Sequence, residues 1–272
     1  MKPEVQSFFD PASHTFTHVV HAGPGSACAV IDSVLHFDPA TGRIDTRGLD
    51  VVANYIRRLS LKLEWILETH AHADHLTGAQ FLKQALGGKT AIGQNIRIVE
   101  EMFAHLYQME GEGHGKGLSF DALWSEGDRF FIGDIACDVM HVPGHTPACV
   151  AYKMGDMVFV GDTLFMPDVG SARCDFPGGN ARTLYRSVKR LLNLPEDTRI
   201  YICHDYPPNG RDPHPVTTVQ IQRERNIHLR DSIDEDAFVA LRTTRDSTLA
   251  APALLVPSLQ VNMRAGHVAN AI

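Results

Sequence analysis

The segment at residues 69–75 constrains the fold of this chain more than any other. It reads Thr-His-Ala-His-Ala-Asp-His and directly follows an apolar run, 63–68, whose length and composition predict a buried strand. In α/β proteins, the loops at strand ends gather side chains from several strands and bind ligands. A loop also frees His70, His72 and His75 from the alternating faces of a regular strand. The sequence therefore predicts a sheet in which this strand ends at a ligand site.

Three further ligand-type residues follow β-like runs in the same way. They are His145 in Pro-Gly-His-Thr-Pro, Asp162 in Gly-Asp-Thr-Leu-Phe and His204 in Cys-His-Asp-Tyr. One histidine pair is often only a polar, solvated loop, but four strand ends with His or Asp are hard to obtain by chance. Without a metal, five imidazoles and two carboxylates buried together would be costly through desolvation and mutual repulsion. We therefore predict that these donors bind one or two transition-metal ions.

The composition excludes several classes of partner and cellular location for a protein with such a site. With 272 residues, 44% of them hydrophobic, the chain can bury a sizeable core without disulfides. Its net charge of −7 offers no positive patch, so nucleic acid is not an expected partner. No apolar run approaches the roughly 18–20 residues of a membrane-spanning helix, and the first ten residues lack a secretory pattern. Five widely spaced cysteines, never in a Cys-x-x-Cys pair, indicate reduced thiols and a cytoplasmic location.

Strand-like and helix-like segments alternate twice along the chain, which predicts one α/β domain over residues 1–272. The first set comprises strands at 15–21, 27–32, 34–37 and 63–68 and helices at 49–61, 75–86 and 94–109, followed by a loop at 111–117. The second comprises strands at 130–132, 135–141, 148–153, 157–160 and 199–203, with a helix after Gly178. From about residue 216 a mainly helical extension is expected, with helices at 216–228 and 234–243 and an irregular tail from Ala251.

The order of these motifs resembles the metallo-β-lactamase superfamily. His-x-His-x-Asp-His is followed by Gly-His-Thr, then Gly-Asp-Thr, then a final histidine, and the match covers almost the whole chain. The resemblance implies an αββα sandwich, in which two mixed β-sheets are flanked by helices and the metal site lies at one edge of the paired sheets.

Two subgroups of that superfamily imply different metal centres here. Glyoxalase II-like thiolesterases hold two Zn(II) ions, which by resemblance would divide the donors into His70, His72 and His145 for one ion and Asp74, His75 and His204 for the other, with Asp162 bridging. Glutathione persulfide dioxygenases keep the same residues but bind one Fe(II), implied here on His70, His145 and Asp162. In that case His72, Asp74, His75 and His204 would orient ligands and water.

The stretch after Asp162 favours the dioxygenase. The segments that resemble this subgroup are Gly-Asp-Thr-Leu-Phe, Asp-Val-Gly, Arg-x-Asp-Phe at 173–176, Thr-Leu-Tyr-Arg-Ser-Val at 183–188 and His-Asp-Tyr at 204–206. The implied reaction converts glutathione persulfide, O₂ and water into sulfite and glutathione. A zinc thiolester hydrolase of the glyoxalase II type is the alternative. A non-catalytic metal- or glutathione-binding module is a third hypothesis, although a protein that only binds has no need of all seven donors.

Glutathione carries two carboxylates, so an arginine clamp is expected in the substrate site. The arginine of the Arg-x-Asp-Phe segment, Arg173, is the candidate by resemblance, and Tyr206 is expected to hydrogen-bond the peptide portion. Asn262 and Arg264 are expected to close over the same pocket from the C-terminal tail. A homodimer is one assembly that the resemblance allows.

Overall fold

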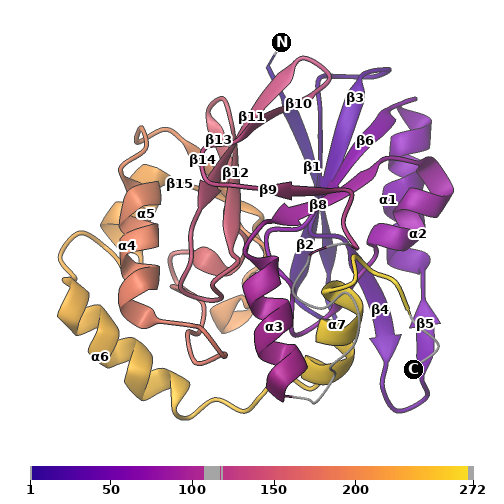
Figure 1. Cartoon of the computed structure of the whole chain (residues 1–272). Coiled ribbons are helices and arrows are strands. Elements are labelled where there is room, and N and C mark those ends of the chain that lie inside the picture. Colours follow the sequence, from indigo (N-terminus) through magenta and orange to yellow (C-terminus); the bar gives the residue numbers. More distant parts are fainter. Residues whose placement is uncertain (1, 107–116, 118, 269–272) are drawn as a thin grey trace.

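Two β-sheets packed face to face form the centre of the protein, and helices cover their outer sides (Figure 1). The computed structural model describes residues 2–106, 117 and 119–268. This is the αββα sandwich implied by the motifs. Among the described residues, every helix is too short or too polar to cross a membrane.

The first sheet comes from the N-terminal half of the chain. Its strands, in spatial order, are β1 (Glu4–Asp10), β2 (Thr15–His21), β3 (Ala27–Ile31), β6 (Lys62–Leu67), β8 (Lys89–Gly93) and β9 (Ala122–Trp124). From β3 onward neighbouring strands are parallel. Helices α1 (Arg47–Arg58), α2 (Ala79–Leu86) and α3 (Ile96–Leu106) follow strands of this half, and β4 (Val34–Asp38), β5 (Arg43–Asp45) and β7 (Leu76–Thr77) form a small separate sheet.

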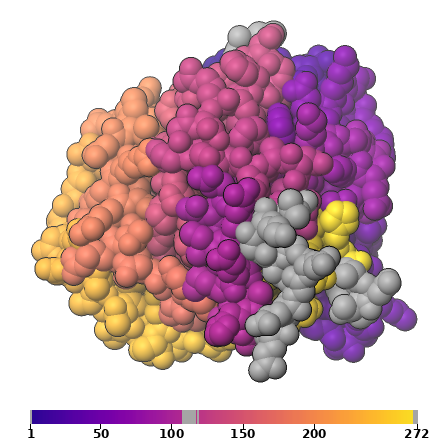
Figure 2. All heavy atoms as spheres, in the orientation of Figure 1, coloured from indigo at the N-terminus to yellow at the C-terminus, as the bar shows by residue number. Residues whose placement is uncertain are grey.

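The second sheet comes from the later part of the chain. Its strands, in spatial order, are β10 (Arg129–Ile132), β11 (Ile135–His141), β12 (Val150–Met154), β13 (Met157–Phe159), β14 (Arg199–Tyr201) and β15 (Val216–Thr218). Helices α4 (Ala181–Leu192), α5 (Val219–Arg225) and α6 (Glu235–Asp246) belong to this half, whereas α7 (Leu255–Asn262) returns to the first half and packs against β7. In Figure 2, the orange-yellow residues of α6 lie along the lower left of the molecule, and the bright yellow residues nearer the C-terminus lie on the right beside the purple first half.

Apolar side chains between the two sheets bind the halves together. Val20 and Leu67 of the first sheet belong to the same buried cluster as Tyr152 and Phe159 of the second. The Tyr152 hydroxyl also donates a hydrogen bond across the sheets to the carbonyl of Glu68, at 2.9 Å. This contact fixes the end of β6, where the histidine-rich segment begins.

Two predicted helix starts were wrong, and in both cases pairing with a strand elsewhere in the chain explains the difference. The helix expected from His75 begins only at Ala79, because Leu76–Thr77 pairs with β4. The helix expected from Val216 begins at Val219, because Val216–Thr218 pairs with β14. The tail expected to be irregular contains α7, and the predicted loop at 111–117 lies, apart from Gly117, outside the described residues.

Candidate metal centre

All seven predicted donors lie at the ends of four strands and meet at one edge of the paired sheets. The segment after β6 supplies four of them, β11 leads to His145, a single 3₁₀ turn (η1, Gly161–Thr163) after β13 carries Asp162, and His204 follows β14. A hydrogen bond from the Phe16 amide to the Cys203 carbonyl, at 2.7 Å, joins the two sheets beside the site. Six of the donors are buried and Asp74 is partly exposed.

Two imidazoles and one carboxylate form the first group of donors. The Nε2 atoms of His70 and His145 each lie 3.8 Å from Oδ2 of Asp162. A metal ion bonded to each donor at about 2.0–2.2 Å spans such a separation. The three side chains therefore form a two-histidine, one-carboxylate triad.

A second group of donors lies against the first. It consists of His72, Asp74, His75 and His204. His204 Nε2 lies 3.5 Å from Oδ2 of Asp74 and 3.3 Å from Oδ1 of Asp162. Asp162 thus presents one oxygen to each group, and the geometry accommodates either one cation or two.

Unpartnered polar atoms within these groups show that the residues fit a metal. Among the described residues, the buried atoms His72 Nδ1, His75 Nε2, His204 Nε2 and Asp162 Oδ1 have no hydrogen-bond partner. Buried polar atoms without partners are uncommon and costly. Binding a cation through these lone pairs removes the cost.

In four of the donor histidines, the ring nitrogen that faces away from the other donors contacts a protein group, and these contacts orient the imidazoles. The contacts are His70 Nδ1 to Thr69 Oγ1 at 3.1 Å, His145 Nδ1 to the Arg173 carbonyl at 2.7 Å, His204 Nδ1 to Thr15 Oγ1 at 3.2 Å and His72 Nε2 to Asp32 Oδ1 at 3.1 Å. Such outer contacts fix the tautomer and the ring orientation of metal-binding histidines. Because the Arg173 carbonyl and the Asp32 carboxylate can only accept, their contacts place a proton on His145 Nδ1 and on His72 Nε2.

Burial and neighbouring charges set the protonation of the donors. Burial, together with the adjacent imidazole of His72, holds the pKa of His70 well below its usual value, so His70 is neutral and able to bind a metal. Burial also lowers the pKa of His72, but the carboxylates of Asp32 and Glu68 outweigh it and raise that pKa well above the usual value. A cation at His72 therefore displaces a proton from this imidazole.

Asn262 does not contact the substrate pocket, so that prediction was wrong. Its side chain is buried, and its Nδ2 donates to the carbonyls of His72 and His75, both at 2.8 Å. Its Oδ1 accepts a hydrogen bond from the Thr77 amide, also at 2.8 Å. Helix α7 thus holds the backbone of the histidine-rich segment, and Asn262 is a positioning residue.

We expect Asn262→Ala to loosen this segment. The change leaves two buried carbonyls and one buried N–H without partners, and it should lower the free energy of unfolding by about 1–3 kcal/mol and weaken metal binding. Urea denaturation and competition with a chelator measure the two effects. Gln260→Ala on the same helix is the control, because this half-buried side chain forms no hydrogen bond within the described part of the chain. Equal metal affinity in both variants would contradict the positioning role.

A cavity of about 350 Å³ opens beside the triad. The donors that line it are Asp74, His145 and Asp162. Its remaining walls include the apolar residues Phe165, Val169, Phe176, Leu249 and Pro252, together with Tyr206 and three arginines, Arg173, Arg242 and Arg245. Its volume lies within the range of about 300–1,000 Å³ found for small-molecule sites.

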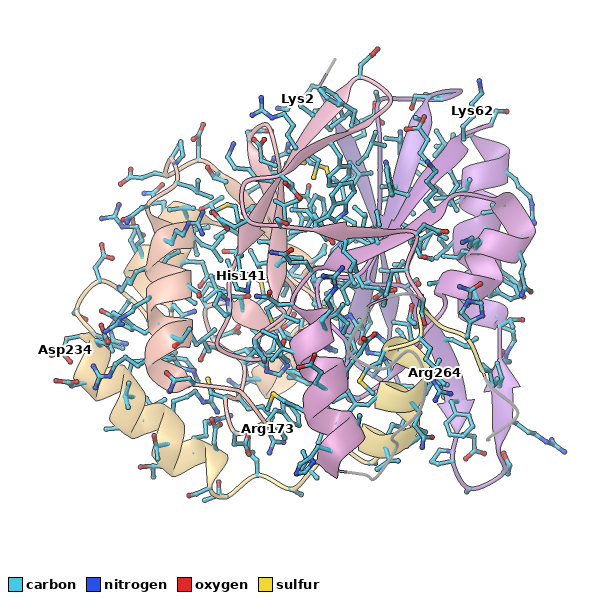
Figure 3. All side chains as sticks on the ribbon, viewed as in Figure 1. Lys2, Lys62, His141, Arg173, Asp234 and Arg264 are labelled. Carbon is cyan, nitrogen blue, oxygen red and sulfur yellow. The ribbon has the colours of Figure 1, made fainter. Side chains whose placement is uncertain are left out.

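The predicted substrate residues differ in their relation to this cavity. Tyr206 lines it, with its ring stacked on that of His204 at a centroid distance of 5.7 Å. Arg173 also lines it, but Nε and Nη2 each donate to Asp175 at 2.6 Å and Nη1 donates to the Ala250 carbonyl at 2.7 Å. Arg264 is not among the lining residues, and its label beside α7 lies well apart from that of Arg173 (Figure 3). The neighbouring Ala265 carbonyl accepts a hydrogen bond from Gln80 Nε2 of α2 at 3.1 Å, which holds the turn after α7 against α2. A role of Arg264 over the pocket stays a prediction.

The family model described as the metallo-β-lactamase superfamily matches residues 10–204, a span that contains all seven donors. The chain belongs to the metallo-β-lactamase superfamily. The metal site at the strand ends is therefore in the place expected for a superfamily member, and the αββα sandwich is that of the superfamily.

Some relatives of this chain are named as a metallo-hydrolase or a glyoxylase, and others as ETHE1, a persulfide dioxygenase. A probable metallo-hydrolase of Burkholderia pseudomallei is 46% identical, over 97% of this chain and 93% of that protein. Glyoxylase B2 of Dictyostelium discoideum is 47% identical, over 98% and 92%. Human mitochondrial persulfide dioxygenase ETHE1 is 29% identical, over 96% and 88%. The crystal structure of ETHE1 from Myxococcus xanthus superposes with a TM-score of 0.77 at 26% identity, covering 97% of this chain and all of that one.

Proposed function

We propose that this superfamily member is an Fe(II)-dependent persulfide dioxygenase that converts glutathione persulfide, O₂ and water into sulfite and glutathione. The triad of His70, His145 and Asp162 carries the proposal. A two-histidine, one-carboxylate face with open positions is typical of non-haem Fe(II) oxygenases. The likeness to ETHE1 in sequence and in structure supports the same activity.

The chain's own residues bind and orient the reactants in this proposal. Iron, when bound, supplies the redox chemistry that joins the persulfide sulfur to O₂. Phe165 and Phe176 line the cavity beside the triad and exclude water from the sulfur. The Thr69 hydroxyl and the Arg173 carbonyl keep the two imidazoles in their binding orientation.

A binuclear zinc thiolester hydrolase is the second candidate. The group of His72, Asp74, His75 and His204 favours it, because these four donors are enough for a second cation next to the triad. The likeness to glyoxylase B2 points the same way. Both candidates place a glutathione derivative in the same cavity.

We propose the cytoplasm as the site of action. All five cysteines are buried and free, which suits a reducing compartment. The homodimer stays a prediction.

Oxygen uptake by Fe(II)-loaded protein tests the proposed function. Supplied with glutathione persulfide, the protein should consume about one O₂ and release about one sulfite per persulfide, as the balanced reaction requires. The Zn(II)-loaded protein, given a glutathione thiolester, is the parallel assay for the hydrolase. Iron-loaded protein that consumes no oxygen with this substrate would overturn the dioxygenase proposal, and thiolester cleavage by the zinc form would favour the second candidate.

A further inference from the structure

We propose that Arg245, on α6, binds a carboxylate of the thiol carrier in the cavity beside the triad. The inference rests on the proposed function, since it names the residue by which that site selects its substrate. It also applies to a glutathione thiolester, because the carrier and its carboxylates are the same.

Arg245 is the one arginine in the cavity wall that has no carboxylate partner among the described residues. Each guanidinium nitrogen of Arg173 already donates a hydrogen bond, two of them to Asp175 and one to the Ala250 carbonyl. Arg242 is buried, with Nε donating to Asp246 at 3.0 Å and Nη1 to the Ser171 carbonyl at 2.9 Å. Arg245 is exposed and forms no ion pair within the described part of the chain. Its donors are therefore available to an anion.

The backbone that carries Arg245 is held firmly on both sides. Three residues earlier, Arg242 ties α6 to the segment at Ser171, and the adjacent Asp246 accepts a hydrogen bond from the Cys174 amide at 2.8 Å. Five residues later, the Ala250 carbonyl is bound by Arg173. Only the Arg245 side chain has to be ordered when a ligand binds, which lowers the entropy that binding costs.

The distribution of polarity in the cavity matches a thiol carrier with a terminal carboxylate. The metal donors Asp162 and His145 line one part, and the aromatic rings of Phe165 and Phe176 line the wall. Arg245 and Leu249, from one end of α6 and the turn after it, form a further wall. A ligand whose sulfur lies at the triad can therefore place its carboxylate on Arg245, where the guanidinium provides a two-point contact.

Calorimetric binding of glutathione and of its diethyl ester to the metal-loaded protein tests this role. We expect Arg245→Gln to raise the Kd of glutathione about five-fold and to leave the Kd of the ester unchanged, because the ester has lost the charge that Arg245 would bind. Arg225→Gln is the matched control, since Arg225 lies on α5 with its side chain 73% exposed and outside the cavity wall. It should change neither Kd.

Steady-state kinetics provide a second readout. Arg245→Gln should raise KM for glutathione persulfide by about the same five-fold and leave kcat within about two-fold, since the contact is far from the reacting sulfur and is made equally in the ground and transition states. Equal losses of binding for the acid and the ester, or no loss for the acid, would overturn the role of Arg245. A chain that consumes no oxygen but shows the acid-specific loss would overturn the dioxygenase proposal and retain Arg245 as the carboxylate site.

Discussion

Asp162→Ala is expected to abolish metal binding and turnover together. Asp162 presents Oδ2 to His70 and His145 and Oδ1 to His204, so it is the carboxylate that both donor groups share. Its removal leaves only the imidazoles of His70 and His145 in the triad and should lower metal affinity by at least about 100-fold, beyond the loss typical of outer contacts. Metal content after dialysis and oxygen uptake are the two measurements.

Two further variants make the Asp162 result specific. Asp162→Asn keeps the shape of the side chain and removes its charge, and it should lose most of the metal as well. Asp156 lies in the turn between β12 and β13 and pairs with Arg199 of β14. The variant Asp156→Ala removes this carboxylate and should retain the metal and the activity. A chain without Asp162 that still binds iron and consumes oxygen would show that the triad is not the metal site.

Asp32→Ala should have the second-largest effect, although Asp32 is not a metal donor. Its Oδ1 lies 3.1 Å from His72 Nε2 and accepts a hydrogen bond from the Thr69 amide at 2.8 Å. All three residues are buried. Losing the buried partner of His72 should cost about 3–5 kcal/mol in the free energy of unfolding and lower metal affinity about 10–100-fold. Chemical denaturation and chelator competition measure these effects.

Asp32→Asn separates charge from backbone conformation at the same position. Asp32 has a φ of 52°, in the left-handed region that asparagine adopts at lower cost than alanine. The asparagine variant should therefore keep most of the stability and lose metal affinity in part. If Asp32→Ala bound metal as tightly as the unaltered chain, the orientation of His72 by this carboxylate would be refuted.

The donors could be predicted from the sequence because they follow one local rule. Each of His70, His145, Asp162 and His204 lies three or four residues after the end of a strand, and strand ends meet at one edge of a sheet. The same rule, applied to the run at 27–31, identifies Asp32, which was missed as a site residue. The succession of strands and ligand-type residues along the sequence was therefore enough to predict most of the metal donors.

The substrate side of the cavity could not be predicted in this way, because its contacts depend on how distant segments pack. Arg173 was expected as the clamp, but Asp175 and Ala250 occupy its donors. Arg245 carries no signal in the sequence, since an exposed arginine on a helix is common. Asn262 was placed in the correct region of the chain with the wrong role, because its three hydrogen bonds join α7 to residues some 185–190 positions earlier.

The metal content of the protein purified without added metal tests the central claim most directly. If the triad of His70, His145 and Asp162 is a single-iron site, elemental analysis should find about one iron per chain and little zinc, as expected for a two-histidine, one-carboxylate centre. About two zinc ions per chain would contradict this account and assign both donor groups to a hydrolase.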